Sequence, residues 1–120
     1  MKYIMLAYTN PEGWANATPE EVQKACDFYA QLGKELSDSG EFVATEGLGD
    51  PSHTVTVRKQ DSGPVATDGP YAEVKEVLVS FGIVDVESHD RALEIAARIV
   101  DAIGDTVELR PLMAPDGFEA

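Results

Sequence analysis

The chain has 120 residues, 43% of them hydrophobic and 26% charged, a size and composition typical of one small globular domain. Its formal net charge is −13, because 22 acidic residues outnumber nine basic ones. Nucleic-acid and anionic-membrane partners are therefore not expected, since phosphate surfaces attract clusters of Lys and Arg. No apolar run approaches the roughly 20 residues needed to span a bilayer. A single cysteine, Cys26, and no recognisable secretion signal predict a cytoplasmic protein.

The first 40 residues predict a strand, a loop and a helix. Residues 2–8 are apolar on both alternating faces, which is typical of a strand that is covered on both sides. Residues 9–17 carry turn chemistry and are expected to form a loop. The stretch Thr18-Pro19-Glu20-Glu21 predicts a capped helix start, and Gly40 supplies the left-handed residue that ends the helix. Cys26 falls on the apolar stripe of this helix and is expected to be buried.

The middle of the chain predicts strands joined by turns. Residues 42–48 and 54–59 alternate as strands do. Residues 65–67 are expected to return as the short partner of a hairpin. A second turn follows at Asp68-Gly69-Pro70-Tyr71, and the long apolar run 77–86 predicts a central strand.

The last third of the chain predicts a helix and a final strand. Ser88 or Asp90 is expected to cap the helix, Gly104 to end it, and residues 106–112 to form the strand. The tail 114–120 is expected to be flexible, which leaves one domain over residues 1–113. The predicted apolar stripe of the helix consists of Leu93, Ala96, Ala97, Val100 and Ile103.

The order of these elements predicts an α+β protein. It is the ferredoxin-like split βαβ arrangement, with an antiparallel sheet and an inserted hairpin. Both helices would cover the same face of the sheet. The first strand is apolar on both sides, so the other face also needs an apolar cover. We therefore predict a homodimer formed by sheet-to-sheet packing.

One segment resembles a known family signature. Residues 67–76 read Thr-Asp-Gly-Pro-Tyr-Ala-Glu-Val-Lys-Glu, which is similar to the D-G-P-F-x-E-x-K-E pattern of the DGPF-type branch of the YCII-related family, with Tyr71 in place of Phe. The start of the chain, the Gly47-Leu48 pair and the ending at residues 107–111 are similar in type and placement. The resemblance covers nearly the whole chain and implies the dimeric α/β barrel form of the ferredoxin-like fold.

The same resemblance implies a His–Asp pair on the first helix, which members of the wider family are suspected to use in catalysis. Asp38 matches the Asp of that pair. The His position falls on Tyr29, so this chain lacks the imidazole that would act as a base near neutral pH. Both residues are kept as ligand-binding candidates.

Glu46 and Asp68 are the candidate acid–base residues. Glu46 is expected to share one strand face with apolar neighbours, where a carboxylate is costly to ionise without a partner, although an exposed strand end is an equal alternative. Asp68 precedes Gly69-Pro70 and is read first as a turn residue. The faces predicted for the second strand group Glu46 with Phe42, Ala44 and Leu48.

Further ligand-binding candidates lie in and near the signature segment. Tyr71 and Glu73 would be held over a pocket by the turn. Lys75 and Arg58 offer cations that could orient an anionic substrate. His53 and His89 are too few and too far apart in sequence for a recognisable metal motif, and no cofactor motif is present, so neither a metal nor a cofactor is expected.

The favoured hypothesis is a domain that binds an unknown small molecule in a pocket lined by Glu46, Tyr29 and the Asp68–Tyr71 turn. The first alternative is an enzyme that uses Glu46 and Asp68 for proton transfer. The second alternative is a regulatory partner in sigma-factor transcription control, which only the family resemblance suggests.

Overall fold

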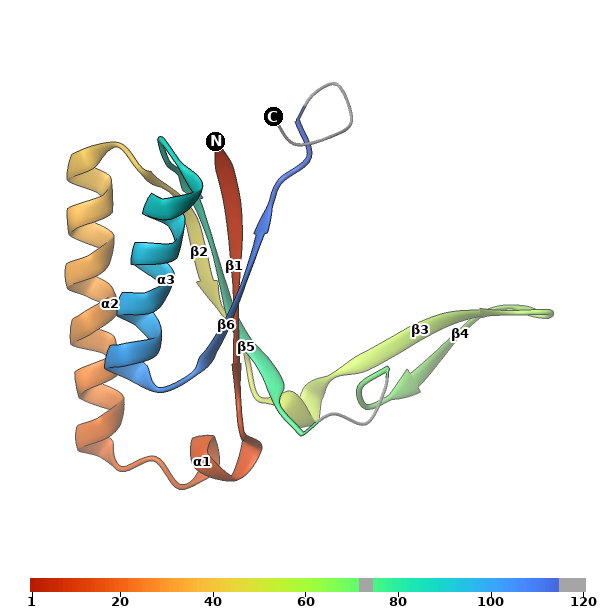
Figure 1. Cartoon of the computed structure of the whole chain (residues 1–120). Coiled ribbons are helices and arrows are strands. Elements are labelled where there is room, and N and C mark those ends of the chain that lie inside the picture. Colours follow the sequence, from red (N-terminus) through yellow and green to blue (C-terminus); the bar gives the residue numbers. More distant parts are fainter. Residues whose placement is uncertain (72–74, 115–120) are drawn as a thin grey trace.

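The computed structural model describes residues 1–71 and 75–114. The described residues form the predicted α+β, ferredoxin-like arrangement with a hairpin inserted between the second and third strands of the main sheet (Figure 1). The barrel-type dimer and the domain boundary at residue 113 stay predictions, and residues 115–120 of the predicted tail lie outside the described residues. The elements are, in order, β1 (Lys2–Thr9), α1 (Pro11–Ala15), α2 (Pro19–Ser39), β2 (Phe42–Gly47), the 3₁₀ turn η1 (Pro51–His53), β3 (Val55–Gln60), β4 (Gly63–Asp68), β5 (Val77–Asp85), α3 (His89–Ile103) and β6 (Thr106–Pro111).

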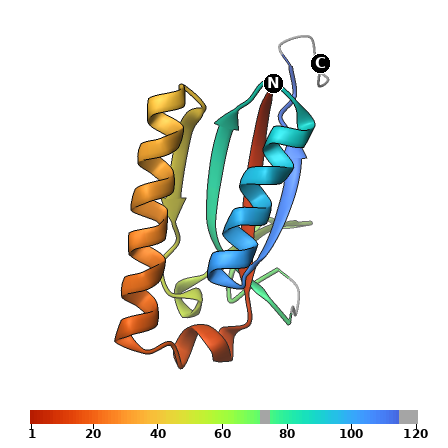
Figure 2. The same cartoon turned by 60° about the vertical axis from the view of Figure 1, so that its left-hand side comes forward.

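The main sheet has four antiparallel strands in the order β2-β5-β1-β6. Strand β1 is central and pairs with β5 on one side and β6 on the other. Helices α2 and α3 cover one face of this sheet (Figures 1 and 2). Strands β3 and β4 form a separate two-stranded sheet that projects on the side away from the helices (Figure 1). The main sheet therefore has an inner face under the helices and an open face.

Helix α2 begins and ends at the predicted residues. The Thr18 hydroxyl accepts a hydrogen bond from the Glu21 amide (3.1 Å), and the Glu21 carboxylate accepts one from the Thr18 amide (3.3 Å). This reciprocal pair is a capping box. At the other end Gly40 has a φ of 81°, which a residue with a Cβ adopts only at a cost. Within residues 1–71 and 75–114, the helices lack the combination of length and apolarity that a membrane span requires.

Residues 9–17 are not the predicted loop, because Pro11–Ala15 form the short helix α1. The Asn10 side chain accepts a hydrogen bond from the Glu12 amide (2.8 Å), and Pro11 takes the first helical position. Asn and Pro start both turns and helices, which is why the sequence pattern favoured a loop here.

The core lies between the helices and the inner face of the sheet. Two predictions about it are wrong. Cys26 is exposed, because the N-terminal half of α2 lies away from the sheet strands (Figure 1). In α3, Leu93 and Val100 are exposed, and the buried face is rotated by about one residue so that two isoleucines point inward. The buried core residues are Tyr3, Met5, Leu32, Leu36, Val84, Val86, Ala92, Ile95, Ala96 and Ile99.

A pair of charged side chains joins the end of α2 to the start of α3. The Arg91 guanidinium donates two hydrogen bonds of 2.9 Å to the Glu41 carboxylate, which also accepts one from the Ser39 hydroxyl (2.7 Å). The Glu41 side chain is only 15% exposed. The hydrogen bonds from Arg91 are the main reason that the pKa of Glu41 lies below its ordinary value. This ion pair fixes α2 and α3 relative to each other at the end of the sheet where β2 begins.

We predict opposite effects for two glycine substitutions in and beside α2. Gly33 has a negative φ, lies inside the helix, and no atom lies within 4 Å of a Cβ added to it. Gly33→Ala should raise the free energy of unfolding by about 0.5–1 kcal/mol, because it restricts the unfolded chain. Gly40→Ala should lower it by about 1 kcal/mol, because the left-handed backbone strains alanine. Urea titrations of both variants test the pair, and a destabilised Gly33→Ala would contradict it.

We predict that Glu41→Gln lowers the free energy of unfolding at neutral pH by about 1–2 kcal/mol, since charge-assisted hydrogen bonds to Arg91 are lost. Because the folded-state pKa of Glu41 is lowered, the ion pair stabilises above the ordinary carboxyl pKa of 4.5. The difference from the original chain should therefore shrink as the pH falls below that value.

The matched control for this prediction is Glu94→Gln. Glu94 accepts a 3.3 Å hydrogen bond from the same Arg91, but its side chain is 66% exposed. Its replacement should change stability by much less, since exposed ion pairs contribute little. Equal losses for Glu41→Gln and Glu94→Gln in urea titrations at neutral pH would show that burial of the Glu41 pair does not matter.

Candidate functional site

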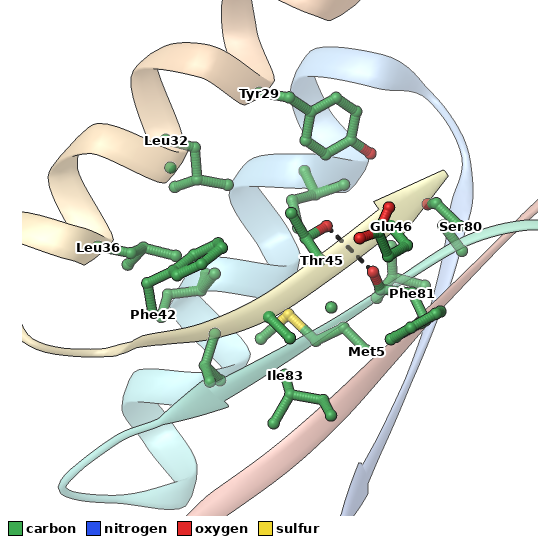
Figure 3. A pocket seen from close by; sticks show the side chains of 18 of the residues that line it. Met5, Tyr29, Leu32, Leu36, Phe42, Thr45, Glu46, Ser80, Phe81 and Ile83 are labelled. Atoms are coloured by element: carbon green, nitrogen blue, oxygen red, sulfur yellow. Dashed lines mark hydrogen bonds between the residues drawn. The ribbon is translucent and has the colours of Figure 1, made fainter. Parts of the chain in front are cut away.

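A cavity of about 340 Å³ lies between α2 and the β2 side of the main sheet (Figure 3). It lies under the C-terminal half of α2, where Leu32 and Leu36 face the sheet across it. Most of its wall is apolar. The lining residues come from α2 (Tyr29, Leu32, Gly33, Leu36), β2 (Phe42, Ala44, Thr45, Glu46, Gly47), β5 (Ser80, Phe81, Gly82, Ile83, Val84) and the neighbouring core (Met5, Ala7, Ile95, Ile99, Val107).

The polar groups of the cavity gather at one end. Figure 3 shows the oxygens of Tyr29, Glu46 and Ser80 at this end, and Leu36 and Phe42 at the other. The Thr45 hydroxyl also lines the cavity, but it already donates a 3.0 Å hydrogen bond to the carbonyl oxygen of Phe81. Tyr29 and Ser80 are therefore the groups that face the cavity from the helix side of the sheet, whereas Glu46, which is paired with Phe81, meets it only at its edge.

Tyr29 is held in its uncharged form. Burial is the main cause that raises the pKa of its phenol, and the negative charge of Asp105 raises it further, whereas a hydrogen bond with Ser80 opposes the rise. Burial likewise raises the pKa of Asp105, opposed by a hydrogen bond from Thr9, and the charge of Glu76 adds to the rise. The polar end of the cavity thus holds neutral hydroxyls beside an acidic neighbourhood.

Glu46 lies at the rim of the cavity. It is exposed, and it sits near the end of β2, an edge strand of the sheet. The prediction that Phe42 and Glu46 share one face is wrong. A β-bulge between Phe42 and Ala44 makes Phe42 pair with Val84 and Glu46 with Phe81, and these two partners point to opposite faces of β5.

The Asp68–Tyr71 turn does not line this cavity in a single chain, so that prediction is corrected. The turn closes the base of the projecting hairpin, where the Gly69 amide donates to the Thr54 carbonyl (2.8 Å). The Tyr71 side chain is 73% exposed, and the guanidinium carbon of Arg58 lies 5.2 Å from its ring centre. The 14-residue hairpin, which spans residues 55–68, returns the chain to the start of β3, and none of the four turn residues lines the cavity.

The other predicted site residues also lie apart from the cavity. Asp38 is exposed and forms a 2.9 Å ion pair with Lys34 on the outer side of α2. Nine residues separate Asp38 from Tyr29, which is about two and a half helical turns and places them on opposite sides of the helix. Lys75 is exposed, and Glu73 lies outside the described residues. Of the predicted residues that the structure describes, Tyr29 and Glu46 therefore meet at the cavity, whereas Arg58 and Tyr71 meet at the base of the hairpin.

Sequence reasoning missed Ser80 and Asp105. Ser80 interrupts the apolar run of β5, and a hydroxyl at such a position is a usable signal for a polar contact inside the fold. Asp105 follows the helix-ending Gly104, and nothing in the local sequence distinguishes it from a solvated loop residue. Across the described ranges 1–71 and 75–114, no three His, Cys, Asp or Glu side chains lie close enough to hold a metal ion.

Comparison with known proteins agrees with this fold. Residues 1–114 match the family model of the YCII-related domain. Over 114 residues, covering 93% of this chain and 92% of the relative, the chain is 27% identical to the uncharacterised protein R00369 of Rhizobium meliloti (strain 1021). The assignment to the DGPF-type branch stays a prediction. On the strength of a match over almost its whole length, the chain belongs to the YCII-related family.

Proposed function

We propose that this protein binds a small, mainly apolar molecule in the cavity between α2 and the sheet. The observation that supports this proposal is the cavity, which combines apolar walls with polar groups at one end. Its volume of about 340 Å³ falls within the range of about 300–1,000 Å³ for small-molecule sites. An apolar cavity of about 150 Å³ holds benzene, so this one has room for about two ring-sized groups.

The polar end of the cavity favours a neutral or positively charged ligand group. The hydroxyls of Tyr29 and Ser80 can donate to or accept from an alcohol, and the Glu46 carboxylate can accept from an alcohol or an amine. No lysine or arginine of the described residues lines the cavity. An anionic ligand would lie near Glu46 and Asp105 without a compensating cation, which is unfavourable.

In a single chain, the two carboxylates that the enzyme alternative requires do not lie at the same site. Glu46 lies at the rim of the cavity, whereas Asp68 ends β4 on the projecting hairpin. Proton transfer by two groups on one substrate requires both within hydrogen-bond reach of it. Binding is therefore the function that the geometry supports best.

Binding is tested with three probes that share one ring and differ in the polar end: 2-phenylethanol, 2-phenylethylamine and phenylacetate. The alcohol and the amine should raise the melting temperature with increasing concentration, because a ligand that binds only the folded state stabilises it. Phenylacetate should have little effect. Tyr29→Phe should weaken binding of the alcohol about two- to tenfold, since it removes one neutral hydrogen bond.

Gly33→Leu is the blocking variant for this experiment, because its side chain would enter the cavity without meeting an atom close to the Cβ. It should abolish the shifts. Asp38→Asn, on the outer side of α2, is the control and should keep them. Stabilisation by phenylacetate alone, an unaltered shift in Gly33→Leu, or no shift from any probe would contradict the proposal.

We also infer that the binding unit is a homodimer packed through the open face of the main sheet. Residues Tyr3, Met5 and Ala7 of β1 point to the inner face and are buried. The alternating residues Ile4 and Leu6 point to the open face, where their partners on β5 are Ile83 and Phe81. These four apolar side chains are half-buried, and no described helix or strand lies over this face of the sheet (Figure 1); an apolar patch of this kind marks an interaction surface.

We predict that Leu6→Glu shifts the protein from dimer to monomer in sedimentation velocity at micromolar concentration. A carboxylate at the centre of the open face would lose its water in the interface without gaining a partner. Leu93→Glu is the matched control, because Leu93 is 47% exposed on the helix side and should leave the dimer intact. A monomeric original chain, or equal behaviour of the two variants, would contradict the inference.

A further inference from the structure

The β3–β4 hairpin leaves the body of the domain as an arm, here defined as residues 55–68. Its strands pair only with each other among the described residues. It projects on the open-face side of the main sheet (Figure 1). The radius of gyration of the chain is 16.5 Å, whereas a compact domain of this length has about 14 Å. The arm is the feature that makes the single chain extended.

The arm exposes apolar side chains that its own chain does not cover. Val55 is 55% exposed and Val57 is 65% exposed. The strand register places both on one face of the arm, where Asp68 lies opposite Val55, Ala66 opposite Val57, and Lys59 and Pro64 follow toward the tip. An isolated two-stranded hairpin is only marginally stable in water, so an arm of this kind is expected to pack on another surface.

The direction in which the arm projects indicates which surface it packs on. A second sheet stacked on the open face would lie about 10 Å away, and a six-residue strand extends about 20 Å. The arm therefore runs past the edge of a stacked second copy and reaches its helix layer. In a two-fold dimer each copy receives the arm of the other, so both arms are covered at once.

The charge distribution favours the same partner. Within the arm, Arg58 and Lys59 balance Asp61 and Asp68, so the entire net charge of −13 lies on the rest of the chain. Lys59 stands near the far end of the arm with Asp61 in the turn beyond it, whereas the Arg58 guanidinium lies against Tyr71, so a nearly neutral arm would meet the acidic body of the second copy.

We propose that the β3–β4 arm of each copy packs its Val55–Val57 face against the flank of a second copy of this chain. This rests on the inferred open-face dimer and extends it by a second contact. It does not depend on the ligand proposed for the cavity.

The direct test is an NMR sample that mixes two preparations of the full chain. One copy carries ¹³C-labelled valine methyl groups, and the other is unlabelled. Isotope-filtered spectra should show contacts from the Val57 methyls to the unlabelled copy. A dimer in which the Val57 methyls show no contact with the unlabelled copy would overturn the proposal. Contacts between the Val57 methyls and a molecule other than this chain would overturn it as well.

A variant pair gives an independent readout by sedimentation equilibrium. Val57→Asp should raise the dimer dissociation constant at least tenfold, because a dimer contains two arms and each would bury a carboxylate. Thr67→Asp places the same charge on the opposite, exposed face of the arm and should change it by less than threefold. Equal effects of the two variants would contradict the arm contact.

These outcomes separate the arm from the other proposals. A dimer without arm contacts would overturn the arm contact alone and leave the open-face interface standing. A chain that stays monomeric would overturn both interfaces but not the cavity. Failure of all three ring probes to shift the melting temperature would contradict the proposed ligand and leave the arm contact to be judged from the Val57 contacts.

Discussion

The structure depends on a central strand that is apolar on both faces. On the inner face of β1, Met5 packs under the helices as part of the core. On the open face, Leu6 lies opposite Phe81, with no described element over it. One helix layer is enough to cover the apolar side chains of a strand only when the other face of that strand is polar. The alternation in β1 therefore dictates two covers, and the fold of one chain supplies one of them.

The cavity follows from how α2 is fixed to this sheet. The helix is held at its C-terminal half by buried Leu32 and Leu36 and by the ion pair of Glu41 with Arg91. Its N-terminal half lacks such anchors, and Cys26 is exposed there. The cavity lies under the anchored half, between Leu32 and Leu36 of α2 and strands β2 and β5, and Tyr29 stands at its polar end, about one turn before Leu32. Its hydroxyl is thereby buried enough to stay protonated yet open to the cavity.

The sequence correctly predicted the features that depend only on interactions between residues close together in the chain. The capping box at Thr18 and the left-handed Gly40 each depend on neighbours within a few residues, and both were confirmed. The face of α3 was predicted only in part, since Ala96 is buried and Ile103 packs against the core, but apolar residues surround much of that helix and only contact with the sheet selects Ile95 and Ile99. The side chains of β2 were misplaced for the same reason. A bulge is set by strand pairing, which no local pattern reveals.

The same distinction between local sequence and tertiary packing applies to the candidate site. Tyr29 was found through the family resemblance and Glu46 from its strand position, whereas Ser80 needed knowledge of which strand faces α2. The Asp68–Tyr71 turn was assigned to the pocket because it carries the family signature, but it lies at the base of the arm and does not line the cavity. The stacking of Arg58 on Tyr71 joins this turn to the arm. The guanidinium carbon of Arg58 lies 5.2 Å from the Tyr71 ring centre, so the signature turn contacts β3 on the face of the arm opposite Val57.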